Sequence, residues 1–161
     1  MNNLLKNIQI IIGGNHMNEN IELLNDIHED SQMGITSLTV LIKKLNNKDN
    51  KIKKIVEEEL KGYEQFQKDS EKLLKKYKAE IIDTNMMVKT MSTMKLNFEV
   101  MKDNSDAKIA DILIKGFTMG TIDMNKKIEA YKDDVKKDIL KLAQNFLKFQ
   151  NENIELLKEY L

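Results

Sequence analysis

Proline is absent from all 161 residues of this chain, and only six glycines occur. These two residues usually end helices and form the turns of β-rich folds. The sequence is instead rich in Lys, Glu, Leu, Ile and Met, which favour helix. It therefore predicts an all-α protein, and its length is typical of a single domain.

Basic and acidic side chains balance at 26 each, so the formal net charge is zero. Such a chain has no excess of positive charge to attract nucleic acid or an anionic membrane. It also contains no cysteine, which excludes disulfides and thiolate metal ligands. We expect a cytoplasmic protein that neither binds nucleic acid nor spans a membrane.

The first 16 residues form a separate segment with a short apolar run. This run is too short to cross a membrane, and no small-residue cleavage site follows it. Residues 13–17 can be encoded by GGA GGT AAT CAT ATG, which reads as a ribosome-binding sequence before a start codon. We hypothesise that translation begins at Met17 and that residues 1–16 are an untranslated or disordered extension. The alternative is a short amphipathic arm that packs on the remainder, residues 17–161.

Two helices are predicted over residues 19–45 and 51–77. The loop "NNKDN" separates them, and Asp49 or Asn50 is expected to cap the second helix. A connection this short makes the helices antiparallel neighbours, forming a first hairpin over 19–77. Core positions recur at alternating spacings of four and three, the pattern of a left-handed bundle. They are Leu24, His28, Ser31, Ile35, Leu38, Ile42 and Leu45, then Ile52, Val56, Glu59, Tyr63, Phe66, Ser70, Leu73 and Tyr77.

A second hairpin is predicted over residues 106–160, with helices at 106–131 and from 134 onward. Asn104 or Ser105 is the expected cap of its first helix. Its core positions are Ile109, Leu113, Gly116, Gly120 and Met124, then Val135, Ile139, Leu142, Phe146, Phe149, Asn153, Leu156 and Tyr160.

Residues 84–103 are predicted to form a short connecting helix with one apolar stripe. We expect this stripe to pack on the core, although methionine could also bind soft copper or an adaptable partner. The stripe consists of Met87, Met91, Met94, Phe98 and Met101.

The second hairpin repeats the first. Phe66-Gln67 reappears as Phe149-Gln150, and Met33-Gly34 reappears as Met119-Gly120. Counting outward from each loop places Gly34 opposite Tyr63 and Gly120 opposite Phe146. We interpret both pairs as a size match, in which the missing side chain makes room for an aromatic ring.

The residues that carry a resemblance to a known superfamily are "LNDIHEDSQMG" and "KIKKIVEEELKGYEQF" in the first half, and "IADILIKGFTMG" and "ILKLAQNFLKFQNENIELLKEYL" in the second. With two hairpins joined by a long crossover, the chain resembles the ferritin-like superfamily, specifically its small bacterial members of unknown function. The resemblance covers residues 17–161 and implies an antiparallel four-helix bundle. Oxidases of that superfamily bind two iron or manganese ions through Glu residues and Glu-x-x-His pairs.

The ligands for such a metal pair are missing. No Glu-x-x-His begins at Glu57, Glu58 or Glu59, and the counterparts of the last two are Lys141 and Leu142. We therefore expect no di-metal oxidase site and no cofactor, with an iron or manganese site as the alternative.

Three polar residues, His28, Asp30 and Glu59, remain candidates for a site. His28 is expected near Ser70 and Asp69, in a polar layer with Ser31 and Asn153 that fixes helix register, or else to act as a pH switch or ligand. Glu59 is expected to turn to the rim while Leu60 takes the core, or else to act as a buried acid or base.

We predict a non-enzymatic scaffold or interaction protein whose partner is another copy of the chain or a different protein. No catalytic residue is assigned. The alternative is an atypical protein that binds a metal or small ligand through His28, Asp30 or Glu59.

Overall fold

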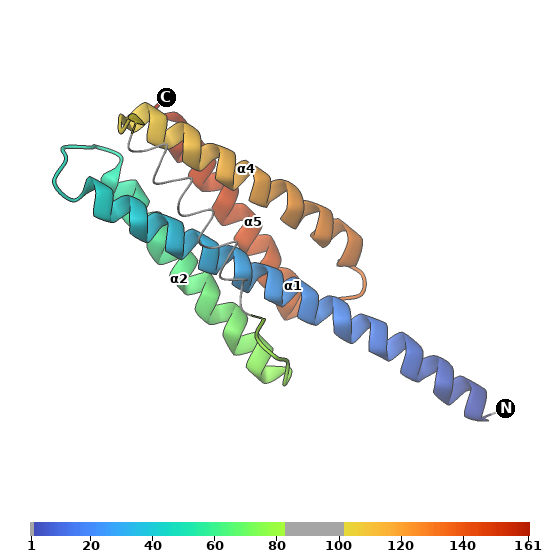
Figure 1. Cartoon of the computed structure of the whole chain (residues 1–161). Helices are drawn as coiled ribbons and strands as arrows, with labels where there is room; N and C mark the ends of the chain where they lie inside the picture. Colours follow the sequence, from blue (N-terminus) through green and yellow to red (C-terminus); the bar gives the residue numbers. More distant parts are fainter. Residues whose placement is uncertain (1, 83–101) are drawn as a thin grey trace.

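The structure is a computed structural model that describes residues 2–82 and 102–161, with side chains described from residue 18. Within these ranges there are four helices and no strand, which confirms the all-α prediction. The helices are α1 (Asn2–Leu45), α2 (Lys53–Lys76), α4 (Asp106–Tyr131) and α5 (Lys137–Lys158) (Figure 1). The predicted methionine stripe lies outside the described residues. No described helix combines the length and apolar character needed to cross a membrane.

The helices pair as two antiparallel hairpins, α1 with α2 and α4 with α5. Two contacts show the register of the hairpin of α1 and α2. Gly34 faces Tyr63, and His28, which comes earlier on α1, faces Glu71, which comes later on α2. Helix α5 also packs on α1 and α2, whereas α1 and α4 touch only sparsely. The predicted pair of packed hairpins is therefore present.

Polar contacts tie the two hairpins together at both ends. At one end, the Asn50 side-chain amide donates to Asp106 Oδ1 at 2.7 Å. At the other end, the Tyr77 hydroxyl donates to Asp138 Oδ2 at 2.9 Å. The ion pair of Lys127 with Asp26 joins α4 directly to α1, and a cleft lies between the same two helices.

The predicted ends of the helices agree with the structure to within a few residues, apart from the start of α1. Ser105 caps α4 as expected, since its hydroxyl accepts a hydrogen bond from the Lys108 backbone N–H at 3.2 Å. The predicted cap of α2 by Asp49 or Asn50 is wrong: Ile52 occupies that position, without a side-chain cap. Asn50 is instead used to join the hairpins.

Helix α1 begins at Asn2 and continues without a break through Gly13 and Gly14. Each glycine disfavours helix by only about 1 kcal/mol, and no proline is present to stop it. Figure 1 shows this first part of α1 projecting beyond the other helices instead of folding back onto them. The helix has no boundary at Met17, and the proposed start of translation there stays a prediction.

Aromatic rings from α2, α4 and α5 form the centre of the core. Neighbouring ring centroids lie 5.0 to 6.4 Å apart, typical of stacked and edge-to-face packing. The rings belong to Tyr63, Phe66, Phe117, Phe146 and Phe149.

The predicted core positions slip by one residue in five places, two of which are Ile42, where Leu41 is buried instead, and Phe149, where Gln150 is buried instead. In the other three, Phe117 is buried instead of Gly116, Leu74 instead of Leu73, and Leu157 instead of Leu156. A helix has 3.6 residues per turn, so it drifts by about 20° per heptad from a strict four-three pattern. The predicted core positions therefore depart from the buried residues when the four-three pattern is extended along a helix.

The glycine contacts confirm one predicted pair and contradict the other. A Cβ added at Gly34 would lie 2.6 Å from the Tyr63 ring, as the size match requires. A Cβ at Gly120 would meet the Gln150 amide, at 2.6 Å from Nε2, so the predicted contact with Phe146 is wrong. Side chains on a helix point toward its N-terminus, which lets the long Gln150 side chain cover Gly120 while Phe146 packs inward.

Candidate functional site

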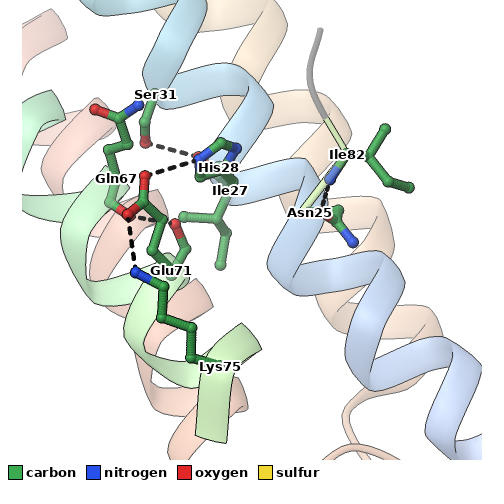
Figure 2. Close-up of polar contacts among 9 residues, drawn as sticks. Asn25, Ile27, His28, Ser31, Gln67, Glu71, Lys75 and Ile82 are labelled. Atoms are coloured by element: carbon green, nitrogen blue, oxygen red, sulfur yellow. Dashed lines mark hydrogen bonds and ion pairs between the residues drawn. The ribbon is translucent and has the colours of Figure 1, made fainter. Parts of the chain in front are cut away.

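His28 lies buried in α1, with 1% of its surface exposed. Its Nε2 is 3.2 Å from Oε1 of Glu71 on α2, as Figure 2 shows. Glu71 reaches the surface, where Lys75 Nζ lies 3.8 Å from its other oxygen. The sequence placed His28 beside Ser70 and Asp69, so the actual partner is one residue further along α2.

The other members of the predicted polar layer are buried as expected. However, Ser31, Ser70 and Asn153 each donate to a carbonyl three or four residues earlier in their own helix, at 2.6 to 2.9 Å. Their hydrogen bonds therefore do not link helices to one another. The contact between His28 and Glu71 is the part of this layer that crosses from one helix to another.

Sequence reasoning missed Asn25, a buried residue on α1. Its Oδ1 accepts from the Ile82 backbone N–H at 2.9 Å, as Figure 2 shows. Its Nδ2 donates to the Ile21 carbonyl, within α1, at 3.1 Å. The bond to Ile82 holds the chain against α1 after the end of α2. An asparagine on the core side of a predicted helix was the available signal.

Glu59 lies in the core with no exposed surface. Neither carboxyl oxygen has a hydrogen-bond partner among the residues that the structure describes. Burial raises the pKa of Glu59 from its ordinary 4.5 to about 8, so the group is a neutral acid at pH 7. The prediction that Glu59 turns to the rim is wrong, because the packing of α2 buries Glu59 and leaves Leu60 only partly covered.

A cleft of about 480 Å³ opens between α1 and α4. It exists because these two helices touch sparsely and because Gly116 contributes no side chain to fill it. A Cβ added at Gly116 would meet no atom within 4 Å. The walls are mostly apolar and include Met33, Leu38, Ile112, Leu113, Phe117 and Met119.

Two buried polar side chains form the floor of the cleft. Tyr63, from α2, stacks on Phe117 with a centroid distance of 5.8 Å, and its hydroxyl lies beside the Gln150 amide of α5. Burial, with smaller contributions from the charges of Asp30 and Glu59, raises the pKa of Tyr63. Gln150 is only 2% exposed, and its Oε1 has no partner within the described part of the chain.

The wall of the cleft carries an excess of acidic groups. Asp30 and Asp123 line it, and burial is the main reason that the pKa of Asp30 rises from 3.8 to about 7. The negative charge of Asp26 raises it further, and Asp123 adds a smaller effect in the same direction. Lys127 opposes these charges but is itself ion-paired with Asp26.

The three candidate ligands named from the sequence occupy different settings. His28 contacts Glu71, Glu59 is enclosed in the core, and Asp30 opens into the cleft. In residues 18–82 and 102–161, no three His, Asp or Glu side chains converge as a metal site would require. An iron or manganese site remains an untested alternative.

Comparison of the chain with protein-family models, with curated proteins and with solved structures found no match. The resemblance to the ferritin-like superfamily therefore stays a prediction. Function has to be argued from the cleft and the residues that line it.

Proposed function

We propose that this protein binds a small, largely apolar ligand in the cleft between α1 and α4 and performs no chemistry on it. The observation that carries the proposal is an apolar cleft with a buried amide, Gln150, on its floor. Ligand sites in proteins typically measure about 300–1,000 Å³ and combine apolar walls with a few fixed polar groups. The cleft, at about 480 Å³, has this size and this composition.

A binding role fits the cleft better than a catalytic one. A nucleophile needs a base within hydrogen-bonding distance to activate it. Among the described residues of the cleft, no hydroxyl is hydrogen-bonded to a carboxylate or histidine; the Tyr63 hydroxyl lies beside the Gln150 amide. We accordingly propose a ferritin-like bundle that uses the space between its helices for a ligand.

The leucine variant Gly116→Leu tests this proposal. The space beside Gly116 is open, so leucine should fill the cleft without overpacking the core. Thr118 is exposed on the same helix, outside the cleft, and Thr118→Leu is the matched control.

The assay is titration with the fluorescent apolar probe N-phenyl-1-naphthylamine. We expect saturable binding to the wild type and to the Thr118→Leu control, and affinity reduced by about tenfold or more in Gly116→Leu, a loss of at least about 1.4 kcal/mol. Absence of saturable binding to the wild type, or equal affinity in Gly116→Leu, would refute the proposal.

A scaffold or interaction protein is the second candidate function. Met119 and Ile122, both on α4, are 69% and 50% exposed, which favours contact with another protein surface. The partner proposed for this role is a second copy of the chain. Sedimentation velocity of the wild type and of Met119→Gln tests it, because a dimer should weaken in the variant, whereas a monomeric wild type would exclude self-association.

A further inference from the structure

We infer that the ligand of this cleft is an amphipathic organic cation, such as an alkylammonium, whose charged head lies against Asp30 and Gln150. This inference rests on the proposed function of ligand binding and adds the chemical class of the ligand. It follows from three features of the cleft: its charge, its unsatisfied acceptor and its apolar remainder.

The first feature is an excess of negative charge, because the single ammonium of Lys127 opposes the carboxyl groups of Asp26, Asp30 and Asp123. The charge of Asp26, and to a smaller extent that of Asp123, disfavours ionisation of Asp30. The neighbouring lysines are engaged elsewhere: Lys127 pairs with Asp26, and Lys115 Nζ lies 2.7 Å from Asp111 Oδ2. A bound cation would restore the balance and favour the ionised form of Asp30.

The second feature is independent of charge. Gln150 lines the cleft, and its buried Oε1 lacks a donor among the described residues. An unpaired buried acceptor is costly, and a ligand N–H would satisfy it. The Tyr63 hydroxyl joins the two features, because it lies beside the Gln150 amide and within the field of the Asp30 carboxylate. An ammonium head beside this hydroxyl could therefore interact with Asp30 and donate to Gln150.

The third feature, the apolar lining of the cleft, indicates the chemistry of the rest of the ligand. Beyond the polar floor the cleft is apolar, with Leu38 and Leu113 facing the space on either side. The Phe117 ring, stacked on Tyr63, adds an aromatic surface that attracts cations. A strongly hydrated ion such as free Mg²⁺ would gain little here, since it retains its water shell. An apolar chain that ends in an ammonium group uses both parts of the cleft.

The test compares three probes with the same body and different heads: heptylamine, 1-heptanol and heptanoate. Binding is measured by displacement of N-phenyl-1-naphthylamine at neutral pH, where heptylamine is a cation. We expect the alkylammonium to bind at least about tenfold more tightly than the alcohol, as charge-assisted hydrogen bonds are the stronger kind. Heptanoate should bind weakest.

The outcomes separate this inference from the proposed function. If heptylamine and 1-heptanol bind equally, or heptanoate binds best, the cation inference fails while ligand binding stands. If none of the three probes binds and the fluorescent probe does not bind either, both fail.

Two variants locate the charge, with a matched control. Asp30→Asn keeps the shape of the side chain and should abolish the preference for heptylamine over 1-heptanol, while Asp49→Asn, in the exposed loop after α1, should preserve it. Binding of 1-heptanol reports whether the cleft is intact. A variant that fails to fold is therefore distinguishable from one that has only lost the charge of Asp30. Asp123→Asn provides the same test if Asp30→Asn does not fold. If Asp30→Asn or Asp123→Asn folds and still prefers heptylamine over 1-heptanol, the inference is wrong.

Discussion

The buried carboxyl of Glu59 should make the stability of this protein fall as the pH rises. In the unfolded chain the group loses its proton near its ordinary pKa of 4.5, whereas burial raises the pKa in the folded protein to about 8. Between these values the folded state holds a proton that the unfolded state has released, so the free energy of unfolding decreases with pH. The contribution of protonated Glu59 is complete below pH 4.5 and is lost as the pH rises through 8.

The size of the effect follows from the shift of the pKa. Each pH unit within this window lowers the free energy of unfolding by up to about 1.4 kcal/mol, so the loss from about pH 5 to pH 8 is about 3–4 kcal/mol. No part of Glu59 is exposed, so solvent does not screen this cost. A domain of this size is stable by roughly 5–15 kcal/mol in total, which makes the change readily measurable.

The perturbation is Glu59→Gln, which keeps the shape of the side chain and removes its titration. Glu58, the preceding residue, has a side chain that is 58% exposed, and Glu58→Gln is the control with an expected effect within about 0.5 kcal/mol. Urea unfolding followed by far-ultraviolet circular dichroism at about pH 5 and pH 8 gives the free energies. At about pH 8, Glu59→Gln should be more stable than the wild type. The difference between their free energies of unfolding should be about 3–4 kcal/mol larger at this pH than at about pH 5. Parallel pH dependences for the wild type and Glu59→Gln would refute the reasoning.

Four further predictions concern stability at fixed pH. Gly34→Leu should lower the free energy of unfolding by about 1–3 kcal/mol through overpacking against the Tyr63 ring, whereas Gly116→Ala should raise it by up to about 1 kcal/mol. His28→Ala should cost about 1–3 kcal/mol, because it leaves a cavity and removes the contact with Glu71. Ser105→Ala should cost about 1 kcal/mol through loss of the cap on α4.

Urea unfolding at neutral pH measures all of these variants. A Gly34→Leu protein as stable as the wild type would contradict the size match, and a destabilised Gly116→Ala would show that its side of the cleft is filled. For His28, the comparison is Glu71→Gln: no loss in either variant would mean that their contact contributes nothing. Thr118→Ala, an exposed position inside α4 and away from its cap, is the control for Ser105→Ala.

The helices follow from local features of the sequence. The absence of proline, the hydroxyl at Ser105 and the apolar spacing locate α4 from Asp106 to Tyr131, as predicted. Such features act through neighbours within one turn, so they can be recognised without knowledge of the fold. The pairing of Gly34 with Tyr63 is also accessible from the sequence, because a short loop determines which residues of a hairpin face each other.

The candidate site depends on contacts among helices that are distant in the sequence. Whether Glu59 or Leu60 enters the core is a matter of helix rotation by a fraction of a turn, which the packing of α2 against its neighbours decides. Gln150 covers Gly120 because its side chain is long enough to reach back along the interface.

The sequence alone determined that this chain is helical, where most of its helices begin and end, and which residues form its first glycine and aromatic contact. Only the tertiary structure decided that Glu59 is enclosed and that Asp30, Tyr63 and Gln150 meet at one cleft. These residues come from three different helices. Their meeting depends on how two hairpins pack together and on the space left where α1 and α4 barely touch, and spacing along one helix carries no information about either.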